Sequence, residues 1–154
     1  MHKCAKIICA EYGGKFPLEE SELLKLPGIG PYTAAALSAI LGGKPSIVID
    51  GNVERVISRL YAITAPLPKS KLEIKKYAAA LTPQKNAGDY AQGLMDLGAT
   101  ICTPRNPKCD LCPWQGSCLA HGEGQEEDYP KKLPKTKKPK RFGAVYWLEN
   151  EAGD

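Results

Sequence analysis

Large aromatic side chains are scarce in this sequence of 154 residues. Aromatic residues make up 7% of the chain, with two phenylalanines and two tryptophans. A hydrophobic core must therefore be built mainly from leucine, isoleucine, valine and alanine, which suits packed helices better than a β-sandwich. The composition predicts a mainly α fold.

Long apolar runs are also missing. Stretches such as Thr33 to Leu41 fall well short of the roughly 20 apolar residues that a membrane-spanning helix needs. The first residues lead into an amphipathic segment rather than the core of a signal peptide. We therefore expect a soluble protein that is not exported and has no membrane partner.

The net charge of +4 is unevenly distributed. Residues 1–122 hold 14 basic and 10 acidic side chains, whereas residues 123–154 hold seven of each. A modest positive excess on a folded body permits nucleic-acid binding without establishing it. The charge alone therefore does not identify the binding partner, and the sequence motifs must be used instead.

Residues 1–101 show a helical pattern that glycine and proline clusters interrupt. The sequence from Ser70 to Glu73 fits a capping box and predicts a helix from Lys71 to about Leu81. A further helix is expected over roughly residues 88–101. An apolar stripe with helical spacing predicts another helix just after Asp50, from Val53, Val56, Ile57, Leu60 and Tyr61.

Residues 123–141 have the composition of an exposed linker. Acidic residues precede a run from Lys131 to Arg141 that holds seven basic residues and two prolines. A solvated tether is favoured here over a basic arm that touches phosphates. Phe142 to Leu148 then has a β-like pattern, and the remaining residues are too few to bury a core. We expect a second domain to begin near Phe142 and to be cut off.

Cysteines carry the strongest motif. Four of the six fall within 17 residues with the spacing C-x6-C-x2-C-x5-C: Cys102, Cys109, Cys112 and Cys118. Such clustering indicates metal ligands rather than a disulfide framework. A [4Fe-4S] cluster needs four thiolates, whereas structural zinc typically uses two Cys-x2-Cys pairs, and only one is present. The spacing favours the cluster, with zinc and unligated thiols as alternatives.

Three further features each allow two interpretations. Arg105 and Lys108, between the first two cysteines, could contact phosphate or merely keep the loop soluble. The glycine turn from Leu26 to Thr33 (L-P-G-I-G-P-Y-T) could present helix amides to a phosphate or be an ordinary turn. Asp50, which ends an apolar run, could cap the next helix or stabilise a cation that forms in a pocket.

In this order, the glycine turn, the aspartate and the cysteines resemble the helix-hairpin-helix DNA glycosylases, and most closely the adenine DNA glycosylase (MutY) family. The resemblance covers residues 1 to about 122 and continues into the linker. It implies a partial helix-hairpin-helix glycosylase fold and a [4Fe-4S] cluster on the four cysteines. It also implies that the turn anchors the DNA backbone through Gly28, Gly30, Pro31 and Tyr32, with Arg105 and Lys108 assisting.

The resemblance further implies hydrolysis of the bond between adenine and deoxyribose, where adenine is paired with 8-oxoguanine or guanine in double-stranded DNA. Asp50 would be the catalytic aspartate, with Asn52 orienting it and Tyr32 near the sugar. Endonuclease III, a related enzyme, has a lysine nucleophile where this chain has Tyr32 and a Thr-His pair where it has Gly51-Asn52. We therefore expect a monofunctional glycosylase. We also expect it to be a monomer, located in a bacterial cytoplasm, a nucleus or a mitochondrion.

The family's general-acid glutamate precedes the segment with which this chain begins. Glu11, Glu19 and Glu20 align after it, so none is assigned its role. We expect four parts: a helical glycosylase region (1–101) without its N-terminal helices, the cluster loop (102–118), a charged linker (119–141) and the first strand of a truncated 8-oxoguanine-recognition domain (142–154). The alternatives are an inactive fragment that keeps DNA and cluster binding, a zinc-binding adaptor and an endonuclease III-like glycosylase.

Overall fold

The structure is a computed structural model that describes residues 1–134, 139–140 and 142–145. Within these residues the chain is helical and has no β-strand, as the composition predicted. The α-helices are α1 (His2–Glu11), α2 (Glu20–Leu23), α3 (Pro31–Ile40), α4 (Gly51–Leu60), α5 (Lys71–Leu81), α6 (Ala87–Thr100) and α7 (Leu119–Gly122). Short 3-10 helices are η1 (Cys109–Leu111), η2 (Gln115–Ser117) and η3 (Glu126–Asp128).

The predicted start of α5 is correct, but the predicted capping box is wrong. Ser70 makes no side-chain capping hydrogen bond and is itself close to helical, with φ −72° and ψ −7°. A capping serine needs an extended backbone to bring its hydroxyl to the free amides of the first turn. Ser70 is instead buried, with 2% of its surface exposed.

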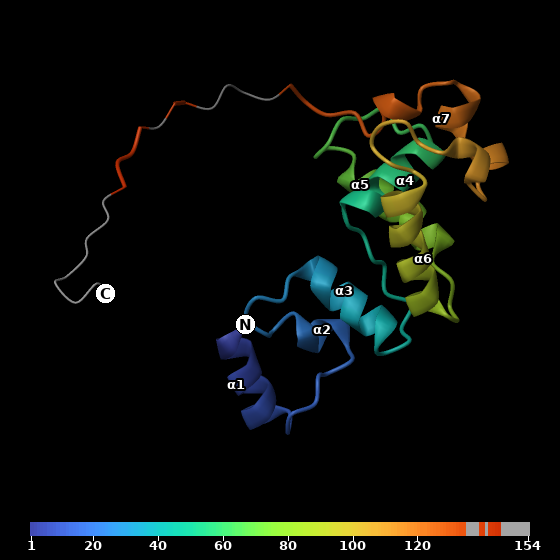
Figure 1. The fold of residues 1–154 in the computed structure, drawn as a ribbon. Helices are drawn as coiled ribbons and strands as arrows, with labels where there is room; N and C mark the ends of the chain where they lie inside the picture. The colour runs from blue at the N-terminus through green and yellow to red at the C-terminus, as the bar shows by residue number, and fades with distance from the viewer. Residues whose placement is uncertain (135–138, 141, 146–154) are drawn as a thin grey trace.

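The helices form two lobes that α6 connects (Figure 1). Helices α1, α2 and α3 share one small core, and α4, α5 and α6 share the largest one. Two glycines let α6 approach both neighbours closely. A Cβ on Gly88 would lie 2.8 Å from the carbonyl oxygen of Ala39 on α3, and one on Gly98 would lie 2.6 Å from Cβ of Asn52 on α4.

Residues 119–132 follow the surface of the helices. Within the predicted tether, residues 123–141, most of the described side chains are exposed, but the path of the chain is not free of the helices. The segment begins with α7, which packs on α4, and continues through η3 to Tyr129, which is 4% exposed. Leu67 and Lys132 then form an isolated bridge, in which the Leu67 amide donates to the carbonyl oxygen of Lys131 at 2.8 Å. Burial of Tyr129, and the hydrogen bond that Arg59 Nε donates to its carbonyl at 3.3 Å, hold this part of the segment against the helices.

The expected strand from Phe142 to Leu148 lies partly outside the described residues. Residues 142–145 have no regular secondary structure, and residues 146–148 are not described. In the part of the chain that is described, no helix has both the length and the apolarity needed to cross a membrane.

Candidate functional site

Asp50 caps α4, as the sequence predicted. Its Oδ1 atom accepts a hydrogen bond from the backbone amide of Val53 at 2.8 Å, and its Oδ2 accepts one from the Asn52 side chain at 3.1 Å. The backbone of Asp50 is extended, with φ −107° and ψ −174°. Because both oxygens have a donor, the carboxylate is held in one orientation at the positive end of the helix.

Arg55 connects Asn52 to α6 and to the cysteine loop. Its Nη2 donates to the Asn52 side-chain oxygen at 2.9 Å and to the Gly98 carbonyl at 2.6 Å, and its Nε donates to the Cys102 carbonyl at 2.7 Å. The side chain is 9% exposed, and this burial lowers its pKa. A single guanidinium therefore ties the first cysteine of the loop to the residue that holds Asp50.

Tyr32 lies on α3 beside a cavity of about 220 Å³ that Ile47, Ile49 and Glu54 also line. Its hydroxyl lies 3.5 Å from the sulfur of Met95 on α6. Ile49 and Glu54 flank the N-terminal end of α4 in the sequence, so this cavity adjoins the part of the chain that holds Asp50. Asp50 itself is not among the lining residues, which include the charged side chains Glu20, Glu54, Lys71 and Lys75 as well as apolar ones.

The glycine turn before α3 has the geometry of a type II turn. The Ile29 amide donates to the Leu26 carbonyl at 3.1 Å, and Gly28 has φ +87°. Proline suits the second position of this turn and glycine the third. Gly30 is the N-cap of α3, and a Cβ there would meet nothing within 4 Å. Open space therefore lies before the first amides of α3, which have no partner within the helix.

The four clustered cysteines line one cavity, together with Arg59, His121 and Glu126 among others. Cys102 follows α6 and its amide donates to the Leu97 carbonyl at 2.7 Å, whereas Cys109 begins η1 and Cys118 precedes α7. All six cysteines are free. Four soft sulfur donors around one space suit an iron-sulfur cluster or zinc.

Arg59 supplies positive charge at this cavity although it is almost completely buried, with 2% of its surface exposed. Its Nη1 donates to the sulfur of Cys102 at 3.3 Å and to the Thr103 carbonyl at 2.7 Å, and its Nη2 donates to the Pro104 carbonyl at 3.1 Å. Hydrogen bonds to ligand sulfurs and nearby charge are features that tune iron-sulfur clusters. The residues present therefore fit such a group.

Two of the four thiols, those of Cys109 and Cys118, are in surroundings that disfavour a bare thiolate. Burial, followed by the neighbouring carboxylate of Glu126, raises the pKa of Cys109 to about 11. Burial also raises the pKa of Cys118. A bound metal removes this barrier because its positive charge deprotonates a coordinating thiol.

Arg105 and Lys108 are exposed on the loop between Cys102 and Cys109, as expected. Two hydrogen bonds hold this loop. The Thr103 hydroxyl donates to the Arg105 carbonyl at 2.9 Å, and the Asn106 amide donates to the Glu127 carboxylate at 2.7 Å. This loop belongs to the lobe of α4 to α7, whereas the glycine turn belongs to the lobe of α1 to α3 (Figure 1).

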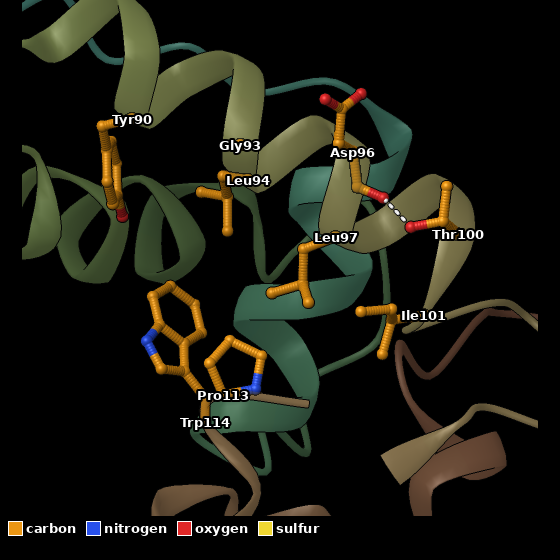
Figure 2. Close-up of a pocket in the computed structure, with 9 residues that line it drawn as sticks. All are labelled: Tyr90, Gly93, Leu94, Asp96, Leu97, Thr100, Ile101, Pro113 and Trp114. Carbon is orange, nitrogen blue, oxygen red and sulfur yellow. Dashed lines mark hydrogen bonds between the residues drawn. The ribbon is translucent and has the colours of Figure 1, made fainter. Parts of the chain in front are cut away.

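A larger apolar cavity, of about 410 Å³, lies between α6 and the cysteine loop. Figure 2 shows Pro113 and Trp114 of the loop opposite Tyr90, Leu94 and Leu97 of α6, with Asp96 pointing away from them. Trp114 also packs against the main core. Its contacts position the loop on α6.

Sequence reasoning missed Arg55 and Arg59. The pattern that could have found them is a second stripe on α4, because Asn52, Arg55 and Arg59 are spaced by three and four residues. Because the adjacent face of α4 is apolar, Arg55 and Arg59 would ordinarily be expected on the solvent-exposed side of the helix. Only the packing of α6 and the cysteine loop shows that they are buried.

Two family models match the chain. Residues 102–118 match the iron-sulfur binding domain of endonuclease III, and residues 11–40 match the helix-hairpin-helix motif. The cysteine loop is therefore an iron-sulfur binding domain, and the type II turn lies within a helix-hairpin-helix motif.

Curated relatives are named adenine DNA glycosylase. The one from Buchnera aphidicola subsp. Schizaphis graminum is 42% identical over 137 residues, which are 88% of this chain and 40% of that protein. The one from Homo sapiens is 39% identical over 127 residues, with coverages of 80% and 23%. The chain spans less than half the length of these relatives.

Solved structures show the same fold. A thermostable thymine-DNA glycosylase matches with a TM-score of 0.70 at 34% identity, covering 79% of this chain and 56% of its own. Endonuclease III in a non-covalent complex with DNA matches with a TM-score of 0.64 at 29% identity and the same coverages. The predicted helix-hairpin-helix glycosylase fold is thus confirmed.

Proposed function

Because the chain is a relative of the adenine DNA glycosylases along most of its length, we propose that it forms part of the catalytic region of a base excision repair glycosylase. The reaction is hydrolysis of the N-glycosidic bond of adenine opposite 8-oxoguanine or guanine in double-stranded DNA. The observation that carries this proposal is the fixed carboxylate of Asp50, held by Val53 and Asn52.

Asp50 would act on the sugar. The adenine must leave the base stack before its glycosidic bond can be reached. The bond then breaks through an oxocarbenium-like state, which an ionised carboxylate stabilises while an acid neutralises the leaving base. Asp50 cannot turn away, because two hydrogen bonds hold it, so its charge needs little reorganisation as the cation develops. Asn52 would be its positioning residue, and Tyr32, which lines the cavity next to Ile49, would lie near the sugar.

The hairpin would hold DNA through backbone amides. Pro31 has no amide hydrogen, so Tyr32 and Thr33 offer the first free donors of α3. These amides and the helix dipole suit a phosphate oxygen, and Gly30 leaves room for it. Arg105 and Lys108 would add a second phosphate contact from the cluster loop.

Cys102, Cys109, Cys112 and Cys118 would be the ligands of a [4Fe-4S] cluster, with Arg59 beside it. Bound there, the cluster would tie together four points of a loop that has little core of its own. Arg55 donates hydrogen bonds to both the Cys102 carbonyl and the Asn52 side chain, so an ordered cluster loop would also help to hold Asn52 in place. In domain terms, residues 1–101 would be the helical glycosylase region and residues 102–118 the cluster loop. The linker (119–141) and the start of a recognition domain (142–154) follow.

An excision assay tests the proposal. A duplex with adenine opposite 8-oxoguanine is incubated with the chain alone and with the chain preceded by the N-terminal segment of the Buchnera aphidicola relative. Because the family's acidic glutamate lies in that segment, the extended chain should excise adenine and the 154-residue chain should be slower by roughly 10²- to 10⁴-fold.

Asp50→Asn in the extended chain is the decisive variant. Asparagine caps a helix about as well as aspartate, so the variant should stay folded and bind the duplex. It should lose excision because the negative charge is gone. If the extended Asp50→Asn chain excises adenine at the original rate, the catalytic assignment is wrong.

An endonuclease III-like reaction is the second candidate, since a solved relative of similar fold is endonuclease III. That reaction uses a lysine that attacks the sugar and forms a Schiff base. This chain has Tyr32 at the matching position, so borohydride should trap no covalent complex with DNA. A trapped complex would favour the second candidate.

A further inference from the structure

Three donor atoms of different chemical types converge beside the four-cysteine cavity. The sulfur of Cys109, a ring nitrogen of His121 and a carboxylate oxygen of Glu126 all lie within 4.8 Å of one another. They come from η1, α7 and η3, so the ordered path of residues 119–128 brings them together. Each is partly buried, and each lines the same cavity.

The spacing of these atoms is close to that of a zinc site. Zinc binds sulfur at about 2.3 Å and nitrogen or oxygen at about 2.0 Å, so tetrahedral ligand atoms lie about 3.3–3.6 Å apart. The Cys109 sulfur lies 3.6 Å from the Glu126 oxygen. The same oxygen lies 2.6 Å from Nδ1 of His121, where a hydrogen bond now joins them. If the Glu126 oxygen and His121 Nδ1 moved slightly apart, a zinc ion could bind between them.

We propose that Cys109, His121 and Glu126 form a mononuclear zinc site that is used when the iron-sulfur cluster is not assembled. Water would complete the tetrahedron. Because Cys109 serves both groups, a chain that holds this zinc ion cannot hold a complete four-cysteine cluster. Zinc would thus compete with cluster assembly through a single shared sulfur.

The surroundings of His121 support its role as a ligand. The side-chain nitrogen of Gln115 lies 3.3 Å from Nε2 of His121, on the opposite side of the ring from Glu126. A metal-binding histidine usually has such a partner on its second nitrogen, which fixes the ring orientation. In the structure the Gln115 nitrogen faces Nε2, so rotation of this amide would present its oxygen to Nε2–H when zinc occupies Nδ1.

A cobalt titration tests the site in isolation. The full chain with Cys102→Ser, Cys112→Ser and Cys118→Ser keeps only Cys109 at the cavity. It should bind one cobalt(II) ion with the charge-transfer absorption of a single thiolate, and zinc should displace the ion. Adding His121→Asn should weaken binding by more than the roughly 10- to 100-fold that loss of an outer partner costs.

A matched control is available within the chain. His2 is the only other histidine. His2→Asn should leave cobalt affinity unchanged, whereas Glu126→Gln should weaken it. If the triple variant keeps its helical circular dichroism but shows no thiolate band, or if His2→Asn weakens binding as much as His121→Asn, the site does not exist.

A second measurement decides the matter if the triple variant does not fold. Cluster reconstitution is followed by visible absorbance in the cluster-free chain with wild-type cysteines, with and without one equivalent of zinc. Zinc should slow reconstitution in the wild-type and His2→Asn chains and lose this effect in His121→Asn. Equal slowing in all three would mean that zinc uses the four cysteines instead, and would overturn the proposal.

Discussion

The guanidinium of Arg55 determines which end of the Asn52 amide faces Asp50. Nη2 of Arg55 donates to the Asn52 oxygen at 2.9 Å, and the Asn52 nitrogen therefore points at the Asp50 carboxylate, 3.1 Å away. Because an arginine can only donate hydrogen bonds, the reverse orientation of the amide would face nitrogen to nitrogen. The orientation of Asp50, the candidate catalytic residue, thus depends on Arg55, which none of the sequence motifs includes.

Replacing Arg55 should destabilise the protein. Arg55→Met leaves three hydrogen-bond acceptors without their charged donor, and we expect a loss on the order of 2–4 kcal/mol in the free energy of unfolding. Urea denaturation followed by circular dichroism measures it. Arg105→Met is the matched control, because Arg105 is exposed and should cost less than about 0.5 kcal/mol. Equal effects of the two variants would contradict the role of Arg55.

Gly98 should tolerate no side chain. A Cβ there would lie 2.6 Å from Cβ of Asn52, so Gly98→Ala must push α6 and α4 apart and should cost about 1–3 kcal/mol. Gly93, on the same helix, has nothing within 4 Å of such an atom. Gly93→Ala should therefore stabilise the helix by roughly 0.5–1 kcal/mol. Thermal unfolding that ranks the two variants in the opposite order would refute this packing.

The two glycines of the hairpin should separate folding from DNA binding. Gly28→Ala forces a φ of +87° on an alanine and should cost about 1–2 kcal/mol of stability. Gly30→Ala meets no protein atom and should leave stability unchanged, yet it should weaken duplex binding because its methyl group occupies the space before the α3 amides. Denaturation and fluorescence anisotropy measure the two effects. Unchanged duplex affinity in Gly30→Ala would argue against the hairpin contact.

Phosphate contacts of Arg105 and Lys108 should appear in the salt dependence of binding. Each contact that is lost reduces the slope of log K against log salt by roughly 0.9. The variant Arg105→Ala, Lys108→Ala should therefore lower the slope by up to about 1.8, with little change in stability because both residues are exposed. A slope and affinity equal to those of the wild-type chain would exclude this loop from the interface.

Loss of any of the four clustered cysteines should remove the cluster. Iron and sulfide analysis of anaerobically purified protein should find both in the wild-type chain and in Cys9→Ser, which changes an exposed residue of α1. Cys4→Ser should also keep the cluster, although Cys4 is buried and its loss costs packing. Zinc without iron or sulfide in the wild-type chain would contradict the assignment, as would cluster loss in Cys9→Ser.

Features that depend on a few adjacent residues could be predicted from the sequence alone. Asp50 caps α4 because a carboxylate reaches an amide three residues ahead, and Pro27-Gly28 makes a type II turn because each residue suits its own backbone angles. The cysteine spacing likewise indicated a ligand loop, since the four thiols lie within one short segment. In each case the interacting groups are neighbours in the chain, so local geometry is sufficient.

Only the tertiary structure decided which polar side chains are buried and which distant groups meet. Arg59 contacts residues more than 40 positions away, and Gly98 matters because α6 lies against Asn52. The acidic segment around Glu126 was predicted to be an exposed linker, yet Glu126 is partly buried and lies 3.6 Å from the sulfur of Cys109. Such contacts depend on how the helices pack, and packing is set by the sum of apolar burial over the whole chain rather than by the spacing of any one motif.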